Sequence, residues 1–372
     1  MTSVVVVGGG IVGACVAYRL AQAGARVTLV EAERLASGAS GASFAWINAD
    51  VKPPLDYHLL NAGGMAEHLA LRHELRAAPW LHITGRTTWA RGDRGQARLR
   101  DRVAQQQEWG YPVEVLPISE LRRLEPELVA PPDVEAFAYY PSEGYVDVPL
   151  LIGALVALAE AAGAMIVQGC RVERFLRDGR RVVGVGTAQQ GEIKADRVVV
   201  CAGAAAAEVV GMAGLRLPMA SNVGMTAVSA PSPVRLGAIH TDGEITIRPD
   251  GAGRVMMRHE RFDERVERTT PVEPPPKVCY ELRDLVATVL PRIAGARIEA
   301  CRITTRPRPG DLYPVVGPAP ETEGLYIVST HSGVTLGPLL GRLVAHEVLF
   351  GARDPRLGPY RPERLVTLEG GR

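Results

Sequence analysis

The sequence predicts an α/β fold in which a parallel sheet covered by helices is interrupted by two insertions that together build a second domain. The chain opens with four valines at 4–7, followed by a glycine-rich turn, a helical stretch at 14–23 and a second strand at 26–30. Buried strands of the same kind return at 195–204 and 324–329. Strands that alternate with helices in this way are typical of a parallel sheet with helices on its faces.

The turn after the first strand carries a dinucleotide-binding fingerprint. Gly8, Gly10 and Gly13 fit the pattern G-x-G-x-x-G, and Glu31 ends the second strand 18 residues after Gly13. The first glycine permits the tight turn, the second lets the backbone approach a pyrophosphate, and the third lets the helix pack on the strand. With a strand before it, a helix after it and an acid at this offset, the pattern indicates a bound dinucleotide.

Glu31 also indicates which dinucleotide fits. Its carboxylate can accept hydrogen bonds from both hydroxyls of an adenosine ribose, and its charge would repel a 2′-phosphate. Ile11 and Val12 lie in the glycine-rich turn before the helix, whose N-terminus carries free N–H groups and a partial positive charge that face the phosphates. We expect these residues, together with Ala32 after Glu31, to contact the cofactor.

Length, charge and cysteine content exclude several classes of protein. At 372 residues the chain suits two domains, and a net charge of +1 gives no field that attracts nucleic acid or an anionic membrane. The five cysteines are scattered without a C-x-x-C pair, which indicates reduced thiols and a cytoplasmic protein. No basic segment precedes the first strand, so we expect no signal peptide. The apolar stretch at 151–167 contains Glu160 and Gly163 and is better interpreted as helix, turn and strand than as a membrane span.

The stretches between the strand–helix units differ from them. Amphipathic helices are expected at 57–75, 96–109 and 118–124, and strands at 220–229, 244–248 and 254–258. Further elements are expected as helices at 149–162 and 333–350 and as strands at 164–167, 169–175 and 181–188. The simplest assembly is a discontinuous nucleotide-binding domain at 1–50, 141–215 and 300–372, with a second domain at 51–140 and 216–299.

With these pieces placed, the chain resembles the D-amino-acid oxidase superfamily of FAD-dependent oxidoreductases over essentially its whole length. The superfamily includes glycine oxidase, sarcosine oxidase and bacterial D-amino-acid dehydrogenase. Four motifs carry the resemblance: the glycine pattern with Glu31, the loop at 38–45 (GASGASFA), the strand and turn at 195–203, and the ending that runs from Thr305-Arg306-Pro307 through Asp311 and 314–317 (PVVG) to His331-Ser332-Gly333.

The resemblance implies an FAD-binding Rossmann-like domain with an inserted α+β substrate domain built on an antiparallel sheet. It also implies oxidation of the C–N bond of a small amino acid or secondary amine, of the glycine, sarcosine or D-amino-acid type, by hydride transfer to flavin N5. Because the cofactor carries this chemistry, the protein needs neither a nucleophile nor a metal. The expected partners are a small-molecule substrate and oxygen or another electron acceptor.

Arg306 and His331 are the catalytic candidates that the resemblance supplies. A guanidinium can grip both oxygens of a substrate carboxylate in a fixed geometry, which makes Arg306 the expected anchor. Arg308 is a rival, because the spacing to Asp311 differs from that in the relatives. His331 can touch the flavin or the substrate, or simply end a strand.

The resemblance also implies further contacts with the flavin cofactor. A helix that begins at Gly333 would place its N-terminus beside the pyrimidine edge and stabilise negative charge at N1 and O2. Val172 would offer its backbone to adenine. The remaining implied contacts are Gly41, Ala42 and Ser43 in the second motif, Ala202 and Gly203 in the third, and Val334, Thr335 and Leu336 after Gly333.

Two departures from the relatives qualify these expectations. Cys301 lies several residues before the point where sarcosine oxidase attaches its flavin, so we expect non-covalent FAD. The oxygen-activating lysine of that enzyme should fall near Met256 and Met257, where this chain has none, and this favours a dehydrogenase over a direct oxidase. Further candidate pocket residues are Trp46, Tyr57, His58, His240, Arg248 and His259.

Three rival interpretations remain at this point. The same scaffold can serve an FAD-dependent 2-hydroxy-acid dehydrogenase. A non-catalytic flavin-binding subunit of a larger complex is the second rival. An NAD-dependent dehydrogenase is disfavoured because the fourth motif would then have no role. The sequence leaves the exact substrate, the electron acceptor and the formation of a homo-oligomer open.

Overall fold

A six-stranded sheet forms the centre of the computed structural model, which describes residues 1–76, 79–243 and 245–369. The strand order is β20-β21-β13-β1-β2-β9, and every neighbouring pair is parallel except β20 with β21. In chain order the strands are β1 (Ser3–Val7), β2 (Arg26–Val30), β9 (Met165–Val167), β13 (Arg197–Val200), β20 (Val315–Pro318) and β21 (Leu325–Ser329).

Both faces of this sheet are buried, which explains the continuous valine run of β1. Side chains alternate between the two faces of a strand, and Val4 and Val6 belong to one hydrophobic core while Val5 and Val7 belong to another. Such runs without polar alternation are typical of parallel sheets that are covered on both sides.

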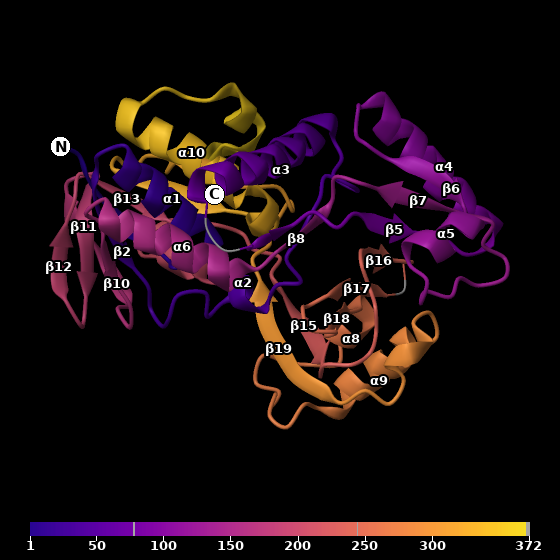
Figure 1. The fold of residues 1–372 in the computed structure, drawn as a ribbon. Coiled ribbons are helices and arrows are strands. Elements are labelled where there is room, and N and C mark those ends of the chain that lie inside the picture. The colour runs from indigo at the N-terminus through magenta and orange to yellow at the C-terminus, as the bar shows by residue number, and fades with distance from the viewer. Residues whose placement is uncertain (77–78, 244, 370–372) are drawn as a thin grey trace.

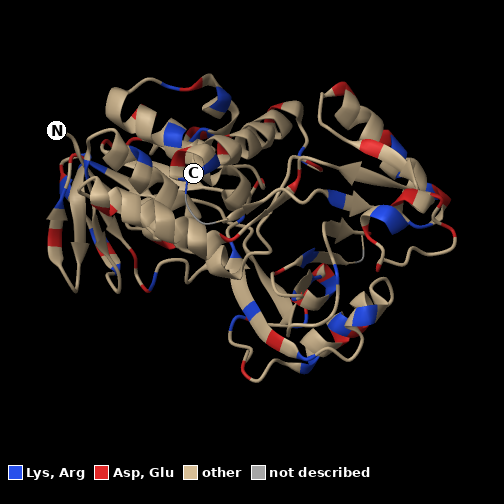
Figure 2. Cartoon of the chain, in the orientation of Figure 1, with Lys and Arg blue, Asp and Glu red and all other residues tan. Residues whose placement is uncertain are grey.

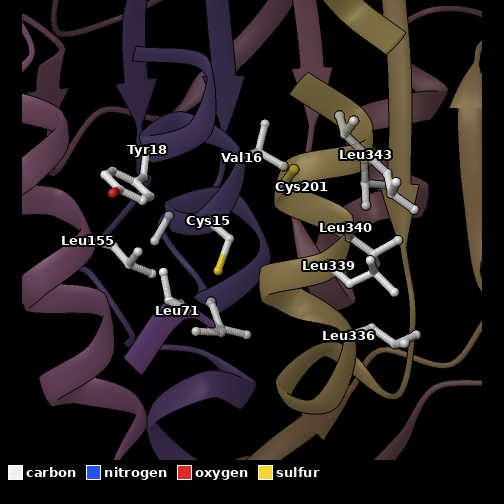
Figure 3. Close-up of a cluster of buried hydrophobic side chains, with 14 of the residues drawn as sticks. Cys15, Val16, Tyr18, Leu71, Leu155, Cys201, Leu336, Leu339, Leu340 and Leu343 are labelled. Atoms are coloured by element: carbon white, nitrogen blue, oxygen red, sulfur yellow. The ribbon is translucent and has the colours of Figure 1, made fainter. Parts of the chain in front are cut away.

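Helices cover the first of these faces. They are α1 (Ile11–Gln22), α6 (Val148–Ala161) and α10 (Gly333–Phe350), with α3 (Leu55–Leu75) packed on α10. Figure 3 shows Cys15, Leu155 and Leu340 among the apolar side chains of this layer. A Cβ at Gly341 would lie 2.8 Å from the backbone of Cys15, so α1 and α10 approach closely because a glycine stands at the crossing.

The other face carries a small antiparallel sheet and a short helix. The sheet consists of β10 (Val172–Asp178), β11 (Arg181–Thr187) and β12 (Gly191–Lys194). Residues after β13 form η1 (Gly203–Ala205) and α7 (Ala206–Gly211). The strand β14 (Leu215–Arg216), which follows α7, pairs with β22 (Thr367–Leu368) near the C-terminus. Two further 3-10 turns are η3 (Pro355–Tyr360) and η4 (Pro362–Arg364).

An eight-stranded sheet in the order β19-β15-β18-β17-β16-β5-β7-β6 builds the rest of the molecule. All of its pairings are antiparallel except that of β16 with β5 (Figure 1). Its strands are β5 (Arg86–Thr88), β6 (Glu114–Pro117), β7 (Ala136–Tyr140), β15 (Asn222–Ser229), β16 (Ile239–Thr241), β17 (Thr246–Pro249), β18 (Val255–Arg258) and β19 (Ile298–Arg306).

Helices and short elements complete this region. The helices are α4 (Gly92–Glu108), α5 (Ile118–Leu124), α8 (Glu260–Asp263) and α9 (Lys277–Val286), followed by the turn η2 (Pro291–Ile293). A three-stranded sheet of β3 (Trp46–Ile47), β8 (Gly144–Val146) and β4 (Leu81–His82), together with α2 (Ala39–Ala42), links the two large sheets along the chain.

The predicted α/β class with an inserted antiparallel sheet is therefore confirmed. The proposed domain limits stay a prediction, and two elements lie across them. Helix α3 falls inside 51–140 but packs on α10, and β19 extends past residue 300 into the eight-stranded sheet. Residues 77–78, 244 and 370–372 of these ranges lie outside the described residues, as does the start of the strand expected at 244–248.

The apolar stretch at 151–167 is split between α6 and β9, as expected. Among the described residues, no helix is both long and apolar enough to cross a membrane. Figure 2 shows Lys and Arg interspersed with Asp and Glu across the molecule, which fits the net charge of +1.

Candidate active site

A cavity of about 800 Å³ opens at the carboxyl ends of β1 and β13. The chain passes from β1 to β2 on one side and later returns to β13 on the other, so the strand order reverses between β1 and β13. Ligands of open parallel sheets bind at such a switch point. The lining extends from Glu31 and Val172 at one end to Arg306 and His331 at the other.

Most of the residues predicted from the sequence line this single cavity. The exceptions are Gly13, Gly41 and Leu336, which are absent from the lining. The predicted residues in the lining are Gly8, Gly10, Ile11, Val12, Glu31, Ala32, Ala42, Ser43, Val172, Ala202, Gly203, Arg306, His331, Gly333, Val334 and Thr335.

The glycine turn leaves no space for larger side chains. Gly8 has a φ of +113°, and a Cβ there would lie 2.5 Å from the carbonyl oxygen of Cys201. A Cβ at Gly13 would lie 1.9 Å from the carbonyl oxygen of Gly8, and one at Gly41 would lie 2.3 Å from that of Ala36. Gly13 and Gly41 therefore act through close packing behind the cavity, which for Gly13 is the role expected from the motif.

Glu31 holds the glycine turn as well as facing the cavity. One carboxylate oxygen accepts from the backbone N–H of Gly9 at 2.7 Å, and the other accepts from that of Glu33 at 2.8 Å. Each carboxylate oxygen can accept more than one hydrogen bond, so both retain capacity for a ligand. The sequence alone did not reveal the contact with Gly9.

The start of α10 presents free backbone donors to the cavity. With Ser332 as the residue before the helix, the N–H groups of Gly333, Val334 and Thr335 precede the first helical hydrogen bond. Leu336 differs, because its N–H already donates to the carbonyl of Ser332 at 2.9 Å and its side chain lies in the core (Figure 3). The expected contact with Leu336 is therefore not available in this helix.

A proline and a histidine fix this first turn of α10. Pro338 lies inside the helix and has no N–H to donate to the carbonyl of Val334. Nε2 of the buried His68 on α3 lies 2.7 Å from that carbonyl oxygen. Burial lowers the pKa of His68 to about 4, so the ring is neutral near pH 7 and Nε2 carries the donated proton.

Arg306 is fixed at the far end of the cavity. Its Nη2 donates to Oδ2 of Asp263 at 2.7 Å, and Oδ1 of Asp263 accepts from the backbone of Met225 at 2.7 Å. The guanidinium extends over Gly224, where a Cβ would lie 2.3 Å from Nε of Arg306. Arg258 shares the same carboxylate, with its Nη2 at 3.6 Å from Oδ2.

Two more cations line the same end. Nζ of Lys52 donates to the hydroxyl of Ser332 at 3.1 Å, and Nη1 of Arg308 lies 3.4 Å from the amide oxygen of Asn222. Both side chains are half-buried. Neither forms an ion pair with any carboxylate that the structure describes.

His331 lies among these cations and exposes its ring to the cavity. The surrounding protein displaces enough water to lower the pKa of His331, and Lys52, Arg308, Arg306 and Arg258 lower that pKa further, to about 3. The imidazole is therefore neutral at physiological pH and does not provide a positive charge.

Of the further pocket candidates, Trp46 lines the cavity, and the other five residues support it or lie elsewhere. Arg248 donates to the carbonyl of Phe44 at 2.8 Å and so fixes the loop after α2. Tyr57 hydrogen-bonds the hydroxyl of Ser332, and His58 hydrogen-bonds the carbonyl of Ala49. His240 is buried beside Thr87 and Trp89. His259 caps α8.

Four residues of the site were not predicted from the sequence: Lys52, Gly224, Arg258 and Asp263. They belong to the loop after β3, to β15, to β18 and to α8. The pairing of β15 with β19 and with β18 brings Gly224 and Arg258 to the Arg306 end of the cavity, and Asp263 is held there by its hydrogen bonds to Met225 and Arg306.

Comparisons with known proteins agree with this geometry. The profile of the DAO family, described as FAD dependent oxidoreductase, matches residues 3–347. Glycine oxidase of Pseudomonas aeruginosa is 28% identical over 388 residues, which cover 96% of this chain and 98% of that protein.

Two solved structures extend the comparison. Glycine oxidase from Geobacillus kaustophilus superposes with a TM-score of 0.84 at 26% identity, over 97% of this chain and 98% of that one. Iminodiacetate oxidase from Chelativorans sp. BNC1 superposes with a TM-score of 0.82 at 26% identity, over 96% and 98%.

Proposed function

The chain belongs to the DAO family of FAD-dependent oxidoreductases, and from this premise we propose that it oxidises the C–N bond of a small amino acid or secondary amine of the glycine, sarcosine or D-amino-acid type. Membership makes the chain an FAD enzyme that acts on amino acids or amines in general. One observation carries the narrower proposal: a single cavity joins the nucleotide end at Glu31 to the cationic end at Arg306.

The residues at the nucleotide end suit FAD. The turn at Gly8 and Gly10 lets backbone N–H groups approach a pyrophosphate, and the carboxylate of Glu31 has acceptor capacity for ribose hydroxyls. Val172 lines the same end and would pair with adenine through its backbone. When bound, FAD supplies the hydride acceptor for the reaction. The free N–H groups of α10 would stabilise negative charge at the pyrimidine edge.

We propose that Arg306 grips the carboxylate next to the carbon that loses its hydride. Asp263 occupies one terminal nitrogen, and no other side-chain hydrogen bond engages the guanidinium within the described residues, so its remaining N–H donors are available to a substrate. A side chain that is already fixed loses little conformational freedom on binding, and this increases affinity.

His331 would contact the substrate as a neutral group. With its pKa lowered to about 3, it is too weak a base to hold a proton taken from an ammonium at neutral pH. A neutral imidazole provides one donor and one acceptor. It can therefore hydrogen-bond the substrate amine and set its orientation without competing for the carboxylate.

The cysteine positions support non-covalent binding of FAD. Cys301 is buried in the core of the eight-stranded sheet, in contact with Cys279, and is absent from the cavity lining. Cys170 and Cys201 line the cavity, but beside Val172 and the glycine turn, which is the nucleotide end.

An anaerobic spectrum of the purified holoenzyme tests the proposal. Glycine, sarcosine, D-amino acids and 2-hydroxy acids are mixed in turn with the protein, and the visible flavin absorbance is followed. Loss of absorbance with an amine is the expected result. Loss with 2-hydroxy acids alone would identify the FAD-dependent hydroxy-acid dehydrogenase instead, and no loss with any compound would point to the non-catalytic subunit.

The related enzymes differ in the number of carboxylates on the substrate for which they are named. The related enzymes are named for glycine, which has one carboxylate, and for iminodiacetate, which has two. The cationic side chains that line the cavity are relevant to the number of carboxylates that a substrate can present to them.

A further inference from the structure

Four cationic side chains gather at the substrate end of the cavity. Lys52 comes from the loop between β3 and α3, Arg258 from the end of β18, Arg306 from the end of β19, and Arg308 from the loop that follows. All four line the cavity, and all four lower the pKa of His331. Their charges are therefore grouped around one ring.

In the described part of the chain, carboxylates form ion pairs with two of these four cations, Arg306 and Arg258. Asp263 pairs with Arg306 at 2.7 Å and lies 3.6 Å from Arg258. Glu260 lies 3.6 Å from Arg258 on its exposed side. Both oxygens of Asp263 already have partners within the protein, since the second oxygen accepts from the backbone of Met225.

Lys52 and Arg308 form no ion pair with the carboxylates of the described chain, and their partners are neutral. Nζ of Lys52 donates to the hydroxyl of Ser332 and lies 5.7 Å from the centre of the Tyr57 ring, and Arg308 contacts the amide of Asn222. Lys52 is half-buried in the cavity wall, where burial lowers its pKa and the charges of Asp50 and Glu143 raise it. An anion beside a partly dehydrated cation is held more strongly than it would be in water. The cavity therefore contains two positive charges that a ligand can compensate.

On the basis of the proposed function, we infer that the substrate is an amine dicarboxylate. Arg306 binds the carboxylate next to the reacting carbon, and Lys52 and Arg308 bind the second carboxylate. A monocarboxylate would occupy Arg306 and leave two half-buried cations without a counter-charge. This assignment gives both Arg306 and its rival Arg308 a role.

A pair of ligands that differ only in the second charge tests the inference. Oxydiacetate has two carboxylates and an ether oxygen in place of the amine, so it is not a substrate for C–N oxidation. Methoxyacetate keeps the ether and one carboxylate. Dissociation constants are measured by calorimetry with the FAD-loaded protein. We expect oxydiacetate to bind about 30-fold more tightly, the scale of one or two charge-assisted hydrogen bonds.

Matched variants assign the difference to the two cations. Lys52→Gln and Arg308→Gln each remove a charge while keeping a polar side chain, and each should reduce the oxydiacetate-to-methoxyacetate ratio to about 5-fold or less. Arg98→Gln, which changes an exposed residue of α4, should leave the ratio as it is. Equal affinities for the two ligands in the unmodified protein, or a ratio that survives both variants, would overturn the inference.

Failure of the inference and failure of the proposed function give different results. Reduction of the flavin by glycine or sarcosine, with equal binding of the two ether acids, would leave the function standing and remove the dicarboxylate substrate. Preferential binding of oxydiacetate, without reduction by any amine, would keep the two-anion site and remove the amine oxidation.

Discussion

The guanidinium of Arg306 and the carboxylate of Asp263 form an ion pair of 2.7 Å at the end of the cavity opposite the nucleotide turn. Asp263 belongs to α8 and is itself bound to the backbone of β15, whereas Arg306 ends β19. The pair therefore joins two strands of the eight-stranded sheet to a short helix. It fixes the cation that we propose as the anchor of the substrate carboxylate.

The first prediction concerns the space beneath Arg306. Gly224→Ala adds a Cβ that would lie 2.3 Å from Nε of Arg306, so the flexible side chain has to move and its grip on the substrate changes. We expect the substrate KM to rise about 10-fold, equivalent to about 1.4 kcal/mol, with FAD content unchanged. Gly153→Ala in α6, where no atom lies within 4 Å of the new Cβ, is the control. An unaltered KM in Gly224→Ala would mean that Arg306 does not bind substrate.

The second prediction concerns the nucleotide end. Glu31→Ala removes the acceptor for the backbone of Gly9 along with the proposed ribose contact. The free energy of FAD binding should become less favourable by about 1–3 kcal/mol, the scale for losing charge-assisted hydrogen bonds. Fluorescence titration of the apoprotein with FAD measures this change. Unchanged affinity would place the ribose elsewhere.

A third prediction follows from the cysteines. Because Cys301 is buried in a core away from the cavity, precipitating the protein with acid should release all of the FAD into the supernatant. The absorbance of the supernatant and of the redissolved pellet checks this. Flavin that stays with the pellet would demonstrate a covalent bond.

The fourth prediction is a loss of stability at mildly acidic pH. Burial lowers the pKa of His68 to about 4, whereas a histidine in the unfolded chain titrates near 6.5. Between these values the unfolded state binds more protons, so the free energy of unfolding falls as pH drops from about 6.5 towards 4. One such histidine contributes up to about 3 kcal/mol over this range.

Two glutamine variants on α3 isolate this effect. His68→Gln removes the titrating ring but keeps an N–H donor for the carbonyl of Val334, and it should reduce the pH dependence of urea unfolding at saturating FAD. His73→Gln changes an exposed histidine of the same helix and should leave that dependence unchanged. Parallel curves for the two variants would exclude His68 as the source.

Sequence patterns identified the elements whose signals are local. The valines of β1, the glycine turn and Glu31 all follow from spacing within about thirty residues, and the limits of α5 and α10 were predicted to the residue. The substrate end differs, because Lys52, Asp263 and Arg306 meet only through strand register and helix docking. No short-range sequence pattern predicts that these three residues lie close together.

Polar and aromatic residue types alone were also a poor guide to the cavity. Tyr57, His58 and His240 carry groups suited to catalysis, yet each is buried with a structural partner. Leu336 was predicted to contact the cofactor for a similar reason. At the start of a helix, a difference of one residue decides whether a backbone N–H is free or already hydrogen-bonded.

The most direct test of the central claim is the dissociation constant of the reducing amine, measured by anaerobic stopped-flow reduction of the holoenzyme. Arg306→Lys replaces a bidentate grip with a point charge, and Arg308→Lys is the matched comparison. We predict that Arg306→Lys raises this constant about 30-fold or more, exceeds the effect of Arg308→Lys, and leaves the flavin spectrum unchanged. An unaltered constant in Arg306→Lys would contradict the proposal that the cavity joins FAD to a carboxylate anchor at Arg306.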